Sequence, residues 1–311
     1  MKPAREAPTF DGFAREWLAM REPELRQKTV ASYSWQLKSH LVPYFGTTRL
    51  SEIGPIDIDR YRSEQLRGAT LGPNQINKTI GLLARILDTA ADYGYLDPTR
   101  NPARGRRRRA KATLPSRAAI EPEQLPSLLE AAGALRPLIA TMAGAGLRNG
   151  EACALDWSDI DLPAGTISVA SAKTGAGIRV VDVPTGLRSE LSALAERGGR
   201  TGVAFPNRNG SRQTTSNVGR RFKTVVRRAN ERLDWLGLNR IDTDPTPHSL
   251  RRLYASLRFA LGDDPVYVAE QLGHTDPTFS IKVYARALRR RERLNGTALR
   301  EFDAALAWAA R

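Results

Sequence analysis

The chain has 311 residues, and its 48 Lys or Arg against 33 Asp or Glu give a formal net charge of +15, which favours a polyanionic partner such as nucleic acid. This length is typical of two domains, and a hydrophobic share of 41% excludes an intrinsically disordered chain. No apolar run approaches the ~18 residues that a membrane span needs, and the single cysteine excludes an internal disulfide and a cysteine-rich zinc site.

Helical periodicity dominates the first hundred residues. Four apolar stripes at helical spacing begin near Phe10, Thr29, Pro55 and Asn74. Thr29 is a candidate N-cap, and the helix that it begins is expected to end before Pro43. An Asn-Pro pair at 101–102 then closes the region, so we predict an all-helical domain over residues 1–103.

A strongly basic segment follows at 104–118, which carries seven basic and no acidic side chains. Its densest part contains Arg104, Arg106, Arg107, Arg108, Arg109 and Lys111. Like charges in such a run repel one another, so the segment is not expected to pack in a core. It is either a flexible linker or localisation-type basic patch, or a linker that lies along a phosphate backbone.

The remaining residues, 119–311, show helical spacing over most of their length and strand-like runs in one part. Helices are predicted over 121–133, 135–145, 149–156, 185–197, 214–233, 247–261, 264–273, 277–290 and 296–309. The β-branched runs at 166–170 and 178–183, joined by a glycine-rich turn, predict a hairpin. The expected fold class is therefore mainly α with a small β-sheet, in which an all-helical domain precedes a mixed α/β domain.

Residues that could carry chemistry are spread through the second domain. His248 and Arg251 are three apart and share one helix face. His274 follows a glycine that is expected to end a helix in the left-handed conformation. Arg148 stands in GLRNGE, and two further candidates are Lys173 in the predicted hairpin turn and Tyr284. Each residue alone is typical of a solvated or structural side chain, and the signal lies in the set.

The order Arg, Lys, His-x-x-Arg, His and Tyr resembles the tyrosine recombinase (phage integrase) family. The motifs that carry the resemblance are GLRNGE, PHSLRRLYAS and QLGHTDPTFSIKVYA, and the similarity extends over nearly the whole chain. The first domain resembles the core-binding (SAM-like) domain of that family. Few residues precede the first helix, so we expect the two-domain form without an arm-binding domain. Arg252 stands where the family often has a histidine.

The resemblance implies a site-specific recombinase or integrase that cuts and rejoins DNA through a covalent 3′-phosphotyrosine intermediate. Arginine forks match phosphate oxygens, which suits Arg148 and Arg251 to a clamp on the scissile phosphate. The remaining implied roles are Tyr284 as the nucleophile, His274 as a third phosphate donor, His248 as general base and Lys173 as general acid.

No metal, ATP or other cofactor is expected. The nearest carboxylates to the predicted site are Asp156, Asp159 and Asp161, for which we expect a structural or solvated role because two arginines already supply positive charge. Glu151 is expected to brace Arg148 or to cap its helix. The chain contains no GxxxxGK[ST] sequence.

Double-stranded DNA is the expected partner. Candidate contacts are Arg106, Arg107, Arg108 and Arg109 in the linker, Lys78 and Arg85 in the first domain, and Arg220 and Arg221 in the second. The cationic helix at 214–233 is either a solvated basic face or a surface that contacts phosphate. We expect a homo-tetramer on synapsed sites, a monomer or weak oligomer when free, and an accessory directionality factor. No membrane is expected, and the absence of an apolar signal sequence predicts a cytoplasmic protein.

Two other functions remain open from the sequence. A type IB topoisomerase would use the same chemistry to relax DNA, and a non-catalytic regulator would bind DNA without covalent capture. The tail from Leu294 to Trp308 has apolar residues near helical spacing, and packs either on its own core or on a neighbouring protomer.

Overall fold

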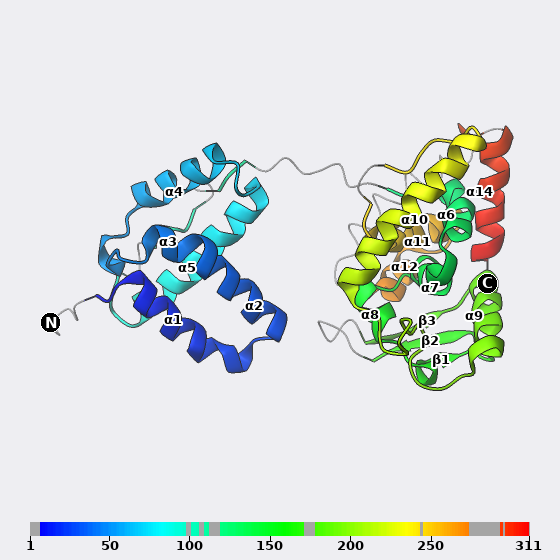
Figure 1. The fold of residues 1–311 in the computed structure, drawn as a ribbon, viewed down its shortest axis with the longest axis horizontal. Coiled ribbons are helices and arrows are strands. Elements are labelled where there is room, and N and C mark those ends of the chain that lie inside the picture. The colour runs from blue at the N-terminus through cyan, green and yellow to red at the C-terminus, as the bar shows by residue number, and fades with distance from the viewer. Residues whose placement is uncertain are drawn as a thin grey trace. The chain divides into compact units, whose positions relative to one another are not determined.

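The computed structural model describes residues 7–97, 101–105, 109–111, 119–170, 178–242, 245–273, 293–294 and 296–310. Two compact units divide the chain, Met1–Pro115 and Ser116–Arg311, and each has its own hydrophobic core (Figure 1). Within the described ranges, every helix is too short or too polar to cross a membrane.

The first unit is helical, as predicted. Its helices are α1 (Phe10–Arg21), α2 (Gln27–Gln36), α3 (Val42–Phe45), α4 (Pro55–Arg67) and α5 (Pro73–Asp92). Along α5, an apolar stripe at 3.6-residue spacing is buried against the other helices. Aromatic rings fill the space between α1, α3 and α4, where Phe45 lies 6.0 Å from Phe10 and 5.5 Å from Tyr61 between ring centroids.

The second helix differs from the prediction at both ends. It begins at Gln27 rather than after Thr29, and the chain stays helical through Pro43. A wide turn over Leu37–Leu41, in which the Val42 N–H donates to the Leu37 carbonyl, lies between α2 and α3. Pro43 therefore falls in the first turn of a new helical segment, where its missing N–H costs little.

The chain after α5 returns along that helix. Asn101 donates its side-chain amide to Asp88 Oδ1 at 2.7 Å, and Arg104 pairs with the same carboxylate at 2.6 Å. Further on, the side-chain amide of Asn77 makes two hydrogen bonds to the backbone of Ala110. It donates to the Ala110 carbonyl at 3.0 Å and accepts from the Ala110 N–H at 2.7 Å. The described parts of the basic segment are thus fixed to α5 at two points.

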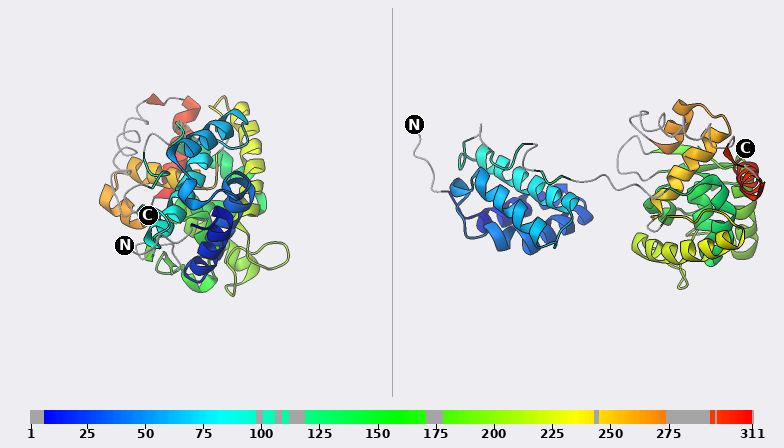
Figure 2. Two further views of the ribbon diagram at one scale, coloured as in Figure 1. Left: turned by 90° about the vertical axis from the view of Figure 1, so that its left-hand side faces the viewer. Right: turned by 90° about the horizontal axis from the view of Figure 1, so that it is seen from above.

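The second unit is an assembly of helices with a small sheet at one edge (Figure 1, Figure 2). Its helices are α6 (Leu125–Ala131), α7 (Arg136–Gly144), α8 (Asn149–Ala154), α9 (Thr185–Gly198), α10 (Thr215–Trp235), α11 (His248–Ala260), α12 (Pro265–Leu272) and α14 (Gly296–Ala309). These agree with the predicted helices, except that the one predicted over 277–290 lies outside the described residues.

The sheet contains the predicted hairpin and one further strand. The strands β1 (Ile160–Asp161), β2 (Thr166–Val169) and β3 (Arg179–Asp182) are antiparallel in that order. Ile167 pairs with Val181, and both are buried toward the helices. Strand β1 was not predicted because two residues are too short to show alternation. The turn with Lys173 lies outside the described residues.

Helix α14 packs on its own unit, against α6, α9 and α11 (Figure 1). Trp308 fits over two glycines, and a Cβ at Gly186 or Gly144 would lie 2.2 or 2.9 Å from its ring. Arg258 of α11 donates to the Ala309 carbonyl at 3.0 Å and lies 5.9 Å from the ring of Tyr267.

Tyr267 carries this network onward to the sheet. Its hydroxyl donates to Asp182 Oδ2 at 2.5 Å, and Asp182 belongs to β3. Since Arg258 touches both Tyr267 and the carbonyl of Ala309, one set of polar side chains links the last turn of α14 with β3.

Candidate active site

Two of the predicted arginines meet at the carboxyl end of α12. Arg251, on α11, is buried and donates to the Gly146 carbonyl at 2.7 Å and to the Leu272 carbonyl. Arg148, the residue directly before α8, donates to the Gly273 carbonyl at 3.3 Å. The two guanidinium groups therefore bind consecutive carbonyls, although they are about a hundred residues apart in the sequence.

Two glycines make this approach possible. Gly146 has a φ of +63°, and a Cβ there would lie 2.7 Å from Tyr254 and 2.9 Å from Leu272. Gly273 ends α12 with a φ of 58° and a ψ of 50°, which confirms the predicted left-handed cap. A Cβ would clash at Gly146 and would be strained by the left-handed backbone at Gly273, and both of their carbonyls accept from an arginine of the site.

Glu151 holds Arg148 in place through hydrogen bonds to both its backbone and its side chain. Its carboxylate accepts from the Arg148 backbone N–H at 2.8 Å and from Arg148 Nη1 at 2.6 Å, so it caps α8 and braces the arginine at once. Burial by itself raises the pKa of this carboxyl, but hydrogen bonds from Arg179 and Arg148 outweigh it and hold the pKa below its usual value. Glu151 is therefore an anion at neutral pH.

A third arginine belongs to this cluster and was not among the residues predicted from the sequence. Arg179 begins β3, its side chain is 7% exposed, and its Nη2 lies 3.1 Å from Glu151 Oε2. Its Nε also donates to the Gln271 carbonyl of α12 at 2.6 Å. One signal was present: Val181 faces the core, and alternation places Arg179, two residues earlier, on the same inward face of the strand.

The described part of the site is positively charged. Burial, with Arg148 and Arg179 close by, lowers the pKa of Arg251 to about 9. The group still carries its charge at neutral pH, so three guanidinium groups face one carboxylate. An anion placed here would relieve the repulsion, and a phosphate offers oxygens that match guanidinium forks. Such donors also stabilise charge that grows on phosphate oxygens in a transition state.

The other predicted catalytic residues are only partly described. His248 is the first residue of α11 and is exposed, three residues before Arg251. Lys173, His274 and Tyr284 lie outside the described residues. In the sequence, His274 directly follows Gly273, whose carbonyl binds Arg148.

The three aspartates after α8 have structural partners. Asp159 accepts from the Asp156 N–H at 2.9 Å, Asp156 pairs with Arg212 at 2.7 Å, and Asp161 accepts from the Ala164 N–H at 2.8 Å. Among the residues that the structure describes, there is no cluster of three or more His, Cys, Asp or Glu side chains that could hold a metal ion.

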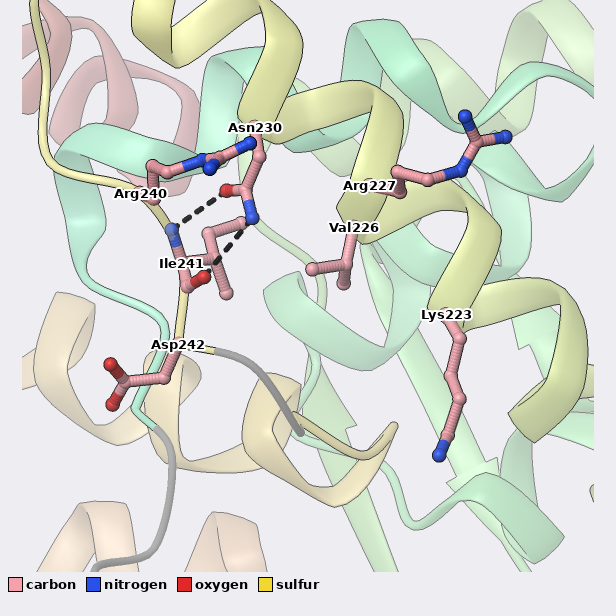
Figure 3. Close-up of a pocket in the computed structure, with 7 residues that line it drawn as sticks. All are labelled: Lys223, Val226, Arg227, Asn230, Arg240, Ile241 and Asp242. Carbon is pink, nitrogen blue, oxygen red and sulfur yellow. Dashed lines mark hydrogen bonds between the residues drawn. The ribbon is translucent and has the colours of Figure 1, made fainter.

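Helix α10 presents exposed cations beside a groove. Its apolar stripe is buried, and its outward face carries Arg220, Arg221, Lys223, Arg227 and Arg228. Figure 3 shows the groove, of about 390 Å³, between α10 and the segment at 240–242. Its lining residues are Lys223, Val226, Arg227, Asn230, Arg240, Ile241 and Asp242. Asn230 fixes the far wall by donating to the Ile241 carbonyl at 3.1 Å and accepting from its N–H at 2.8 Å.

The predicted DNA contacts of the first unit lie on exposed positions where they are described. Lys78 and Arg85 are exposed on α5, and Arg85 donates to the Tyr33 hydroxyl. Arg109 is exposed, while Arg106, Arg107 and Arg108 lie outside the described residues.

Comparison with known proteins gives a consistent result for both units. Residues 118–291 match the phage integrase family, and residues 9–66 match the N-terminal SAM-like domain of phage integrases. Prophage integrase IntR of Escherichia coli (strain K12) is 27% identical over 337 aligned residues, which cover 91% of this chain and 77% of IntR.

Two solved structures share the fold. The Tn1549 transposon integrase in complex with a circular intermediate DNA superposes with a TM-score of 0.77 at 17% identity, covering 91% of this chain and 99% of that chain. A lambda integrase tetramer bound to a Holliday junction superposes with a TM-score of 0.71 at 20% identity, covering 88% and 79%. The expected fold, a helical SAM-like domain followed by a mainly helical domain with a small sheet, is confirmed.

Proposed function

We propose that this chain, which belongs to the phage integrase family and is a site-specific tyrosine recombinase, cuts and rejoins DNA through a bond between Tyr284 and a 3′-phosphate. The observation that carries the proposal is the meeting of Arg148 and Arg251 at the end of α12, directly before His274 in the sequence. A phosphate held by these two arginines is an electrophile whose negative charge is offset before the nucleophile approaches.

The reaction exchanges one phosphoester for another. The phenol oxygen of Tyr284 forms a bond to phosphorus, and the bond from phosphorus to the 5′ oxygen breaks. The phenol proton passes to His248, and the leaving 5′ oxygen takes a proton from Lys173. Rejoining is the reverse step with another 5′ hydroxyl, so the bond energy is conserved and no ATP is consumed. In this proposal His274 adds a third donor to the phosphate.

The two units divide the work in this proposal. Residues 1–103 form the core-type DNA-binding domain, 104–118 the basic linker, and 119–311 the catalytic domain with its tail helix. The exposed cations Arg109, Arg220 and Arg221 contact the phosphate backbone, and Lys78 and Arg85 on α5 reach base edges; the exposure of all five side chains supports this assignment.

Exchange between two duplexes cuts four strands, and one tyrosine per strand requires four protomers. We therefore include a homo-tetramer on synapsed sites, with an accessory factor that sets direction. The proposal also places this reaction in the cytoplasm.

A library of nicked duplexes with random sequence tests the proposal. The nick lets the cut fragment diffuse away, so a covalent protein–DNA adduct accumulates and survives SDS. Wild type is expected to yield this adduct in EDTA, and Tyr284→Phe is expected to bind the enriched DNA without forming it. An adduct with Tyr284→Phe contradicts the nucleophile, and binding without any wild-type adduct supports a non-catalytic regulator. Relaxation of supercoiled DNA without strand exchange supports a topoisomerase instead.

A further inference from the structure

Arg179 connects three elements of the candidate site. It belongs to β3, it reaches Glu151 of α8 with Nη2 at 3.1 Å, and it donates from Nε to the Gln271 carbonyl of α12 at 2.6 Å. Its side chain is only 7% exposed. A guanidinium group that is removed from water costs stability unless its partners are well placed, so the two partners of Arg179 are what allow it to be buried here.

The Glu151 carboxylate is shared between two arginines. Its Oε1 accepts from Arg148 Nη1 at 2.6 Å, while its Oε2 accepts from the Arg148 N–H at 2.8 Å and from Arg179 at 3.1 Å. One carboxylate therefore faces two guanidinium groups and offsets neither fully, so Arg148 can still attract an anion. Without Arg179, the carboxylate would turn its full charge on Arg148 and compete with a phosphate for that guanidinium.

The second contact of Arg179 fixes the strand to the helix. Gln271 accepts from Arg179 through its carbonyl and from the Asp182 N–H through Oε1 at 2.8 Å, so it binds both ends of β3. In the sequence, β3 follows the turn with Lys173, and α12 precedes His274. Arg179 thus links β3 to α12, the two elements that neighbour Lys173 and His274 in the sequence.

We propose that Arg179 is a positioning residue for the recombination reaction, acting by dividing the charge of Glu151 so that Arg148 remains available to the phosphate. This inference rests on the proposed function. It differs from a simple structural role because it predicts that Arg179 matters only while Glu151 is charged.

The test compares Arg179→Met, Glu151→Gln and the double variant on the nicked duplex. We expect Arg179→Met to lower the single-turnover rate of adduct formation by about 100-fold, the loss typical of a misplaced reacting group. DNA affinity at fixed salt should stay within about 3-fold, since one buried arginine contributes little to the backbone contacts. The double variant should be faster than Arg179→Met, because neutral Glu151 no longer competes for Arg148.

Two controls separate positioning from folding. Arg212→Met removes an arginine of the same unit that pairs with Asp156 and has a 46% exposed side chain, and it should leave the rate unchanged. Arg179→Lys keeps the charge beside Glu151 without the fork to Gln271, and it should recover part of the rate. Thermal unfolding of each variant reports its folded fraction.

The outcomes are distinct. A wild-type adduct with an unchanged rate for Arg179→Met overturns the inference, as does a double variant whose loss equals the product of the single losses. If Arg179→Met is unfolded, Arg179→Gln, which is neutral but still polar, takes its place in the same comparison with Glu151→Gln. No adduct from wild type overturns the proposed function itself.

Discussion

The two units bury different kinds of side chain. In the described residues of the first unit, the buried polar side chains are neutral, Gln36 and Thr79, within a core rich in aromatic rings. The second unit also buries four charged side chains, Glu123, Glu151, Arg251 and Arg258. Buried charge costs stability unless it is paired. Two of the four, Glu151 and Arg251, belong to the candidate site, so the second unit gives up stability there, whereas the first unit keeps its charges on the surface.

Removing Arg251 should break this comparison most strongly. Arg251→Ala deletes the proposed buried donor to the phosphate, so we expect the single-turnover rate of adduct formation to fall by about 1,000-fold. The measurement is single-turnover cleavage of the nicked duplex. Arg85→Ala, which changes an exposed arginine of the first unit, should alter DNA affinity and not the cleavage rate of bound DNA. A near-wild-type rate for Arg251→Ala would contradict the clamp.

The glycine beneath Arg251 comes next. Gly146→Ala adds a Cβ that meets Tyr254 and Leu272 at a positive φ, so we expect a loss of about 3 kcal/mol in the free energy of unfolding. Gly237→Ala is the matched control, since its φ is +68° and a Cβ there meets nothing within 4 Å. It should cost about 1 kcal/mol by denaturant unfolding. Equal losses would mean that the backbone conformation, and not the close packing, governs Gly146.

Added phosphate should stabilise the second unit and not the first. If inorganic phosphate binds the folded site and not the unfolded chain, as we propose, then at ten times its Kd it should add about 1.4 kcal/mol of stability to the second unit. Calorimetry with and without phosphate measures the shift. Arg148→Ala is expected to reduce it, and an equal shift in the first unit would mean that phosphate acts non-specifically.

The lowered pKa of Arg251 determines how stability and phosphate binding should change with pH. The pKa of Arg251 is lowered to about 9 against an ordinary value of 12.5. Between these values the unfolded chain binds more protons at this position, so the contribution of Arg251 to the free energy of unfolding rises with pH. Phosphate binding needs the charged form and should weaken above pH 9. A phosphate shift that stays constant to pH 11 would contradict this assignment.

The smallest effect belongs to the first unit. The buried Tyr61 hydroxyl donates to Thr79 Oγ1 at 3.1 Å, so Tyr61→Phe should cost about 1 kcal/mol of stability there. The rate of adduct formation on bound DNA should not change. Denaturant unfolding and the cleavage assay check the two statements, and a slower cleavage step would show that the units are coupled more closely than separate cores suggest.

Local patterns predicted most of the fold and part of the site. Helical spacing identified α5 and α10, β-branched runs identified the hairpin, and a glycine after an apolar helix identified the cap at Gly273. Each of these depends on residues within one or two turns. The helical course through Pro43 was missed because a wide turn is not visible in apolar spacing.

The role of Arg179 was missed for a different reason. Its partner Glu151 lies 28 residues earlier, and the two meet only when β3 packs beside α8 and α12. A buried arginine cannot be told from a solvated one until that packing is known. Motif order identified Arg148 and Arg251, while the charge balance between them is a property of the tertiary structure.

The cis position of α14 has a consequence for truncated forms of the protein. The last turn of this helix supplies the Ala309 carbonyl to Arg258, which also faces Tyr267, and Tyr267 binds Asp182 at the end of β3. A premature stop codon that removes only the final few residues would therefore withdraw a partner from a buried cation and loosen the strand that carries Arg179. We expect such a product to keep the exposed cations of α5 and α10 and to cleave DNA more slowly, so that it competes with the intact protein for DNA.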